Sequence, residues 1–406
     1  MTTKYLSLVS LASALAAVGL GIGCSAGTDG TGAGTPGGTG GDDTASTGQF
    51  TTGSAGDCKT SPDADFDGDG FSVNQGDCND CDPAVNPGAV EIVTADGPPT
   101  DEDCDGFIDV ASACDDGLAL TDTDPMNGAR AIGLCKQATG DSWGVISAAY
   151  VRANGSPAPN PGAHVGILND FGSAVQPRSG SAMLGLSSGY ARDASDAGAC
   201  AGGSCSDLGG GVAPAGFPQD VPSCAGATDI NDDIGLELRV RAPSNVQSYS
   251  YEFKFHSFEF PEYVCTDFND QYIALVNPAP QGSINGNISF DSNTNPVSVN
   301  IAFFDVCDPA TSSDWALICQ FSFGNCPPLP NPYCPSGPSE LAGTAFEQDG
   351  ATSWLVTTAP VDPGSEFTIR FAIWDTGDTA LDSTVLIDNF RWSGSPGDVG
   401  TIEVPK

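Results

Sequence analysis

Acidic residues are crowded into one stretch near the front of the chain, from Asp63 to Asp109. Fifteen of the 52 Asp and Glu residues lie between Asp57 and Asp109, many of them at alternate positions with Gly and Cys between them. Two carboxylates about 5 Å apart repel each other by roughly 1 kcal/mol even in water, and by more when they are partly buried. Lys59 is the basic residue nearest in the sequence. A folded structure for this stretch therefore needs another source of positive charge, and a hard divalent cation with oxygen ligands would supply it.

Two segments fit the template of a calcium-binding loop. The first loop, residues 65–71, places Asp at positions 1, 3 and 5, Gly at position 6 and a backbone carbonyl at position 7, and the second loop, residues 101–107, repeats this pattern. Neither has Glu at position 12, so they resemble the shorter calcium loops of dockerins and thrombospondin type 3 repeats, to which neighbouring loops add ligands. The predicted calcium ligands are Asp63, Asp65, Asp67, Asp69, Phe71, Asp77, Asp80, Asp82, Asp101, Asp103, Asp105, Phe107 and Asp109.

The same region resembles a family, the MopE-type metal-binding motif of bacterial surface and secreted proteins. The matching segments are Asp67-Gly-Asp69-Gly-Phe71, Gly76-Asp-Cys-Asn-Asp80, Asn86-Pro-Gly-Ala-Val-Glu91 and Asp103-Cys-Asp-Gly-Phe-Ile-Asp109. The resemblance implies cation binding and a cell-surface context, and it implies no reaction. The alternative is an acidic linker without a fold, against which the cysteines and the repeated Gly-Phe pair argue.

The overall composition excludes several classes of partner. The net charge is −39 with only 13 Lys and Arg, which argues against nucleic acid and against electrostatic docking to anionic lipid. Two histidines leave little for zinc sites or for acid–base chemistry.

The N-terminus reads as an export signal. An apolar run from Tyr5 to Ile22 precedes Gly23-Cys24, which resembles the lipobox of bacterial lipoproteins, in which this Cys becomes the lipidated first residue. An ordinary secretory signal cut near Ala26 is the alternative. Without Cys24, 14 of the 15 cysteines remain and can pair in an oxidising compartment. We therefore expect a secreted protein, held by a lipid at the outer membrane or cell surface of a Gram-negative bacterium.

Five parts follow along the chain. Residues 1–23 form the signal peptide, 24–56 a disordered Gly/Thr-rich linker, 57–114 the acidic module with its Asp and Cys residues, 115–394 a β domain and 395–406 a tail. About a dozen short segments with strand character, separated by Gly, Pro, Asn and Asp, predict a mainly β protein with an antiparallel, jelly-roll-like β-sandwich. The predicted strands are 143–151, 164–168, 181–186, 234–240, 248–258, 271–276, 287–290, 297–304, 353–358, 366–374 and 383–392. A short helix is predicted over Ala129–Gln137. On the strand 248–258, aromatic residues at alternate positions should face the core and the polar ones water.

The β domain resembles the choice-of-anchor family of bacterial extracellular domains, type L most closely. The residues that carry the resemblance are Phe258 to Tyr272, Asp375-Thr-Gly-Asp378 and Ala380 to Trp392. No common catalytic activity is implied. Oxygen-bearing side chains at these strand ends form a second candidate set, which could hold calcium or a sugar or only shape the turns: Glu262, Asp267, Asn269, Asp270, Asp378 and Asp382.

Two enzyme interpretations remain as alternatives. Gly185-Leu-Ser187-Ser-Gly189 matches a hydrolase pattern but lacks a convincing helix after it, and Glu259 with Glu262 could form a glycosidase pair. We assign no catalytic residue. The sequence favours a calcium-binding surface protein with a structural or adhesive sandwich, whose partners are calcium and an extracellular glycan or matrix protein.

Overall fold

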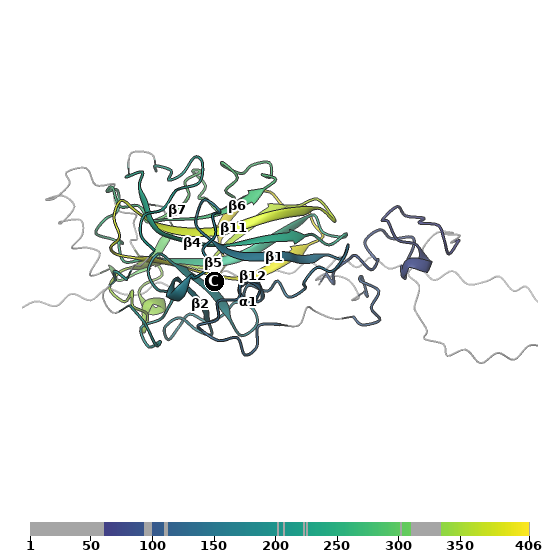
Figure 1. Cartoon of the computed structure of the whole chain (residues 1–406), viewed down its shortest axis with the longest axis horizontal. Coiled ribbons are helices and arrows are strands. Elements are labelled where there is room, and N and C mark those ends of the chain that lie inside the picture. The colour runs from purple at the N-terminus through teal and green to yellow at the C-terminus, as the bar shows by residue number, and fades with distance from the viewer. Residues whose placement is uncertain are drawn as a thin grey trace, which may run out of the picture. The chain divides into compact units, whose positions relative to one another are not determined.

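Two antiparallel β-sheets pack face to face in the computed structural model of the chain, as Figure 1 shows. It describes residues 61–92, 100–108, 113–200, 203–205, 208–221, 224, 226–300, 303–309 and 334–405. The signal peptide, Cys24, the linker and Asp109 lie outside these residues. The predicted antiparallel sandwich is confirmed.

The first sheet has the strand order β1-β4-β11-β6-β7. Its strands are β1 (Gly144–Val151), β4 (Ile230–Arg241), β11 (Glu366–Thr376), β6 (Gln271–Asn277) and β7 (Val297–Ser298). The second sheet has the order β13-β10-β5-β12-β3-β2, and β9 joins it through β5 and β8 through β9. Its strands are β13 (Gly400–Glu403), β10 (Leu355–Pro360), β5 (Ser248–Ser257), β12 (Ser383–Ser393), β3 (Met183–Ser187), β2 (Val165–Leu168), β9 (Gly350–Thr352) and β8 (Phe304–Cys307).

The aromatic row of β5 forms the centre of the core between the sheets. Tyr249, Tyr251, Phe253 and Phe255 are each at most 1% exposed, as their alternation predicts. The ring of Tyr251 meets Phe371 of the opposite sheet edge to face, with centroids 5.0 Å apart. Aromatic pairs of this kind add to the hydrophobic gain of burial, which fixes the two sheets against each other.

The polar row of β5 is buried as well, so the prediction that it faces water is wrong. Lys254 and His256 are both 0% exposed. Lys254 forms an ion pair with Glu340 at 2.6 Å, and the ring of His256 lies against Phe171 and Phe346. Segments distant in the sequence cover this outer face, and strand alternation carries no information about such a cover.

Helices are few and short in the described residues. Helix α1 spans Pro125–Ala131, earlier than the predicted Ala129–Gln137, because Asp124 caps it by accepting from the N–H of Met126 and Pro125 suits its first turn. The 3-10 turns are η1 (Val73–Gln75), η2 (Gly162–His164) and η3 (Ser339–Leu341). None of the helices in the described part of the chain is long and apolar enough to cross a membrane.

Some predicted strand limits are also corrected. Residues 287–290 make only isolated bridges, and the predicted strand 297–304 is replaced by β7 and the start of β8. The short strands β9 and β13 were not predicted. Disulfides hold several of the long loops: Cys78–Cys104, Cys114–Cys135, Cys200–Cys205, Cys224–Cys265 and Cys307–Cys334.

The acidic module is joined to the sandwich at the loop between β4 and β5. Asn245 accepts from the N–H of Val90 at 3.0 Å and donates to its carbonyl at 2.8 Å. Ser244 donates from its hydroxyl to Asn86 at 2.7 Å and from its N–H to the carbonyl of Gly88 at 2.9 Å. The module and the sandwich thus share a hydrogen-bonded seam within one compact unit, Ala55–Lys406.

Replacing Asn245 with Ala should lower the free energy of unfolding by about 1–2 kcal/mol, because both backbone groups of Val90 lose their partner. Chemical denaturation of the full chain, with Asn160→Ala at an exposed position as the control, would measure this. An unchanged midpoint would mean that the seam contributes nothing to stability.

Candidate metal centre

The first loop folds around the side chain of Asp65. One of its carboxylate oxygens accepts a hydrogen bond from the N–H of Gly68 at 2.7 Å, and the other accepts from Gly70 at 3.0 Å. Asp69 accepts from the N–H of Phe71 at 2.8 Å. Both glycines have positive φ angles, 86° and 99°, which residues with a Cβ rarely adopt. Alternating Asp and Gly therefore dictate the tight curl of the loop.

The second loop repeats this local fold. Asp101 accepts from the N–H of Gly106 at 3.0 Å, five residues on, and Asp105 accepts from Phe107 at 2.8 Å, two residues on. These are the same offsets as in the first loop. The common spacing of Asp and Gly thus produces the same backbone arrangement twice.

Two carboxylates that follow the first loop, Asp77 and Asp80, converge on Asp67 within it. Asp67, Asp77 and Asp80 each offer an oxygen, and these oxygens lie within 4.8 Å of one another. Asp77 and Asp80 are 3% and 2% exposed. One oxygen of Asp77 accepts from the N–H of Asn79 and one of Asp80 from that of Phe66. The Oδ2 atom of all three aspartates has no hydrogen-bond partner, which leaves three buried oxygens free to bind a cation.

The electrostatics of this cluster is unfavourable without an ion. Burial is the largest cause that raises the pKa of Asp67, Asp69 and Asp77, and the charged neighbours that raise it further are themselves aspartates. Buried charge without a counter-charge costs stability. A divalent cation would offset this cost and lower these pKa values, because a nearby positive charge favours the ionised carboxylate.

A second cluster involves a residue absent from the predicted ligands, Glu91. An oxygen of Glu91 lies within 4.8 Å of ligand oxygens of Asp101 and Asp103. Burial and a hydrogen bond with Glu102 raise the pKa of Glu91 to about 7. Glu91 closes one of the matched MopE-type segments, so that resemblance was the signal that could have identified it.

Lys136, which is distant in the sequence, brings a positive charge to this second cluster. Asp103 and Asp105 raise the pKa of Lys136, although burial has the larger effect and lowers it. Its Nζ also lies 4.2 Å from the ring centroid of Trp143. Lys59 is thus not the only base near the module, because Lys136 acts on the second loop. Among the described residues, no Lys or Arg is a main cause of the pKa shifts of Asp67, Asp69 and Asp77, so the first loop is the stronger candidate site.

The other predicted ligands are less involved. Asp63 is exposed and accepts from Asn74 at 2.5 Å, and Asp82 is exposed and accepts from the N–H of Ala84. Neither Asp63 nor Asp82 is among the carboxylates that converge in the two clusters. The predicted ligand atom of Phe107 is its backbone carbonyl, on which the 70% exposure of its side chain has no bearing.

The second candidate set is only partly brought together. Asp270 and Asp382 are buried close enough for their charges to interact. Glu262 and Asp267 are exposed. Two more accept backbone hydrogen bonds, Asn269 from Asn300 and Asp378 from Ala380.

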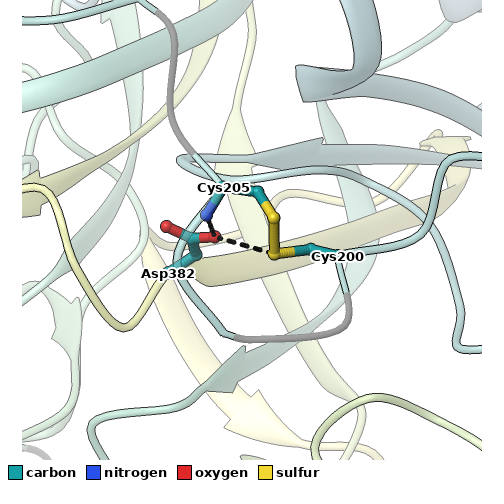
Figure 2. Close-up of side chains that lie close together, drawn as sticks. All are labelled: Cys200, Cys205 and Asp382. Atoms are coloured by element: carbon teal, nitrogen blue, oxygen red, sulfur yellow. Dashed lines mark hydrogen bonds between the residues drawn. A yellow bond between two sulfur atoms is a disulfide. The ribbon is translucent and has the colours of Figure 1, made fainter.

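Asp382 also lies beside two cysteines, as Figure 2 shows. Its Oδ2 accepts from the N–H of Cys205 at 2.7 Å and lies 3.8 Å from the sulfur of Cys200. The two sulfurs are bonded to each other as a disulfide. Neither sulfur is a thiolate, so Cys200, Cys205 and Asp382 do not form a site for a thiolate-binding metal such as zinc.

The hydrolase pattern does not lead to an open site. Ser187 is 1% exposed and donates to the carbonyl of Ser383 at 2.9 Å. The cavity beside it has a volume of about 10 Å³, room for about one water molecule. A larger hollow of about 300 Å³ lies over the first sheet, where the ion pair of Glu237 and Arg370 lines it.

Known proteins give one family match. Residues 220–391 match the family model of the Choice-of-anchor L domain. The match supports the choice-of-anchor resemblance over β4 to β12, and it indicates a secreted or cell-surface protein. The acidic module and the N-terminus lie outside it, so the MopE-type motif and the lipid anchor stay predictions.

Other comparisons add little. No curated protein matches the chain. Among solved structures, the chain is similar to the enzymatically active domain of tailspike protein 4 from bacteriophage CBA120, at 10% identity and a TM-score of 0.18. The similarity covers 56% of this chain and only 17% of that one, and a score so low carries no argument.

Proposed function

We propose that this chain is a calcium-binding protein of the cell surface whose β-sandwich has a structural or adhesive role and no catalytic one. The observation that carries the proposal is the convergence of Asp67, Asp77 and Asp80, each with an unpartnered oxygen. Oxygen-only ligands with this much negative charge favour a hard divalent ion.

Calcium suits the first loop better than magnesium. Calcium accepts six to eight oxygens in flexible geometry, whereas magnesium demands a tight octahedron and keeps several waters. Asp69 adds a further buried oxygen without a partner, and Asp65 already shapes the loop around the site. An irregular, ligand-rich pocket of this kind supports calcium.

Ion binding would also act on the sandwich. The seam through Ser244 and Asn245 ties the acidic module to the loop between β4 and β5. An ion that orders the module therefore stabilises the anchorage of that module to the sandwich. A lipid on Cys24 and the linker after it would hold the whole at a distance from the membrane, where the sandwich could contact a glycan or a matrix protein.

Calcium should raise the thermal midpoint of the full chain relative to a chelator. Saturation at about 100 times the dissociation constant stabilises a folded protein by about 2.7 kcal/mol. Calorimetric unfolding in calcium, in magnesium and in EDTA measures this, and magnesium should have the smaller effect. Identical melting curves together with no heat of calcium binding would refute the proposed function.

The adhesive role has a separate readout in the same conditions. Beads coated with the chain should bind to matrix proteins or to cells that carry the chain on their surface when calcium is present. They should release them in EDTA. Equal binding in calcium and in EDTA would show that adhesion does not depend on the ion.

A further inference from the structure

Four acidic side chains are buried at one end of the sandwich, far in sequence from the acidic module. Glu259, Asp270, Asp375 and Asp382 are each at most 2% exposed. In the first sheet, Asp270 directly precedes β6 and Asp375 lies at the end of β11. In the second sheet, Glu259 follows β5 and Asp382 directly precedes β12. The antiparallel registers bring these strand ends to the same end of the sandwich.

Asp270 links the two sheets by hydrogen bonds. Its Oδ1 accepts from the N–H of Thr376 at 2.9 Å, on β11 of its own sheet. Its Oδ2 accepts from the hydroxyl of Ser383 at 2.7 Å, on β12 of the opposite sheet. Asp270 is therefore held between the layers, in a fixed position.

Asp375 beside it is unsatisfied. Neither of its carboxylate oxygens has a hydrogen-bond partner, although the side chain is 1% exposed. Ser188 and Asp270 lie near enough to influence its pKa, but the Ser188 hydroxyl is engaged with the backbone of Ser383. A buried carboxylate with both oxygens unused is costly and calls for a ligand.

The charged groups that contribute most to the pKa shifts of Glu259, Asp270 and Asp375 are themselves acids. Asp382 raises the pKa of Asp270 and Asp375 in addition to burial, the largest cause, and the pKa of Asp270 reaches about 7. Glu259 has a raised pKa from burial and from Asp270. No ion pair among the described residues involves any of the four.

We propose that a divalent cation of the calcium type binds between the two sheets against Asp270 and Asp375, with Glu259 and Asp382 completing its negative surroundings. The donors at hand are carboxylate and hydroxyl oxygens, which select a hard ion. The cysteines near Asp382 are closed in a disulfide, so no thiolate competes for a softer metal. The ion would link the two sheets at the end of the sandwich where these four acids lie.

The rival account is a pair of touching carboxyl groups that holds a proton in place of an ion. The two accounts differ in what the replacement Asp375→Asn does. Because no described N–H or O–H group donates to Asp375, this variant removes one negative charge beside Asp270 without taking the acceptor from such a donor. Asp229→Asn is the matched control, since Asp229 is an exposed acid at the same end of the sandwich, directly before Ile230, which pairs with Thr376.

The test uses the full chain in a background that carries Asp77→Asn and Asp80→Asn, so that binding by the first loop does not interfere. Native mass spectrometry in calcium should show one ion fewer for Asp375→Asn than for its parent or for Asp229→Asn. In EDTA, Asp375→Asn should melt above its parent, because the like-charge contact is gone. In calcium the order should reverse.

Two results would overturn the proposal. One is an equal number of bound ions in Asp375→Asn and its parent. The other is a higher melting temperature for Asp375→Asn in calcium and EDTA alike, which indicates the proton-holding pair. If Asp375→Asn does not fold, crystals of the unmodified chain grown with terbium decide: an anomalous peak against Asp375 supports the site, and its absence overturns it. If Asp77→Asn with Asp80→Asn lowers the number of bound ions and Asp375→Asn does not, the proposed function stands. Only the inference of an ion between the sheets is then refuted.

Discussion

Calcium binding by the acidic module is expected to weaken roughly a thousandfold when Asp77 and Asp80 are both replaced by Asn. Mutation of a residue that merely supports a metal ligand already costs roughly 10–100-fold in affinity. Loss of two ligand charges should therefore cost about 4 kcal/mol, at about 1.4 kcal/mol for each factor of ten. Titration calorimetry of the full chain measures the change as loss of the tightest binding step.

The replacement is designed to keep the fold of the module. Asn retains the Oδ1 atom with which Asp77 and Asp80 accept from the N–H groups of Asn79 and Phe66. What it removes is the charge on the unpartnered oxygen. The local turns should survive, and circular dichroism in EDTA should be unchanged.

A matched double variant controls for net charge. Asp116→Asn with Asp141→Asn removes two exposed acids outside the clusters and should leave calcium affinity within about twofold, because screened surface charges act weakly. Equal affinities for the two double variants would show that Asp77 and Asp80 bind no ion.

The sequence predicts the local part of the metal centre well, since spacing alone determines it. Asp65, Asp67 and Asp69 stand at alternate positions before Gly70, and the two loops fold alike. The contribution of Glu91 and Lys136 depends on tertiary contacts across the chain. No pattern within a loop contains that information.

The buried carboxylates show a different limit. Strict alternation on β11 would place only one of Trp374 and Asp375 inside, yet both are at most 1% exposed. Both faces of this part of β11 are covered: Phe371 and Ile373 belong to the core between the sheets, while Ala372 and Trp374 pack with Phe217 on the other face. A pattern with a period of two carries no information about such a cover. Glu259, considered beside Glu262 as a catalytic pair, is likewise buried while Glu262 is exposed.

The ion-free chain should become more stable as the pH falls from about 8 to about 5, and Asp388 on β12 isolates part of this effect. Its carboxylate accepts from the N–H groups of Arg178, Ser179 and Asn389. These bonds lower its pKa, but burial outweighs them and raises it to about 7 from an ordinary value of 3.8. The folded state therefore binds the proton more tightly than the unfolded state.

The sign follows from that difference. The ionised Asp388 costs stability above pH 7, and the cost is progressively removed as the pH falls through 7 towards the unfolded value. At about 1.4 kcal/mol per pH unit, the gain between pH 7 and pH 5 is roughly 3 kcal/mol. His256 acts in the opposite direction, because burial holds its pKa well below 6.5 and stability is lost as the unfolded chain protonates below that value. Glu366, whose pKa is lowered by Arg241 and Arg239, loses its contribution only below 4.5.

Comparison with Asp388→Asn separates these contributions. The variant carries no titrating group at this position, whereas His256 and Glu366 act equally in both proteins and cancel in the difference. Urea unfolding in EDTA at pH 7.5, 6 and 5 should show the unmodified chain gaining roughly 3 kcal/mol relative to the variant on acidification. Exposed Asp362→Asn should give a curve parallel to that of the unmodified chain. If Asp388→Asn runs parallel as well, the proton on Asp388 does not contribute to stability in this range, and burial of that carboxylate is compensated by its three N–H donors.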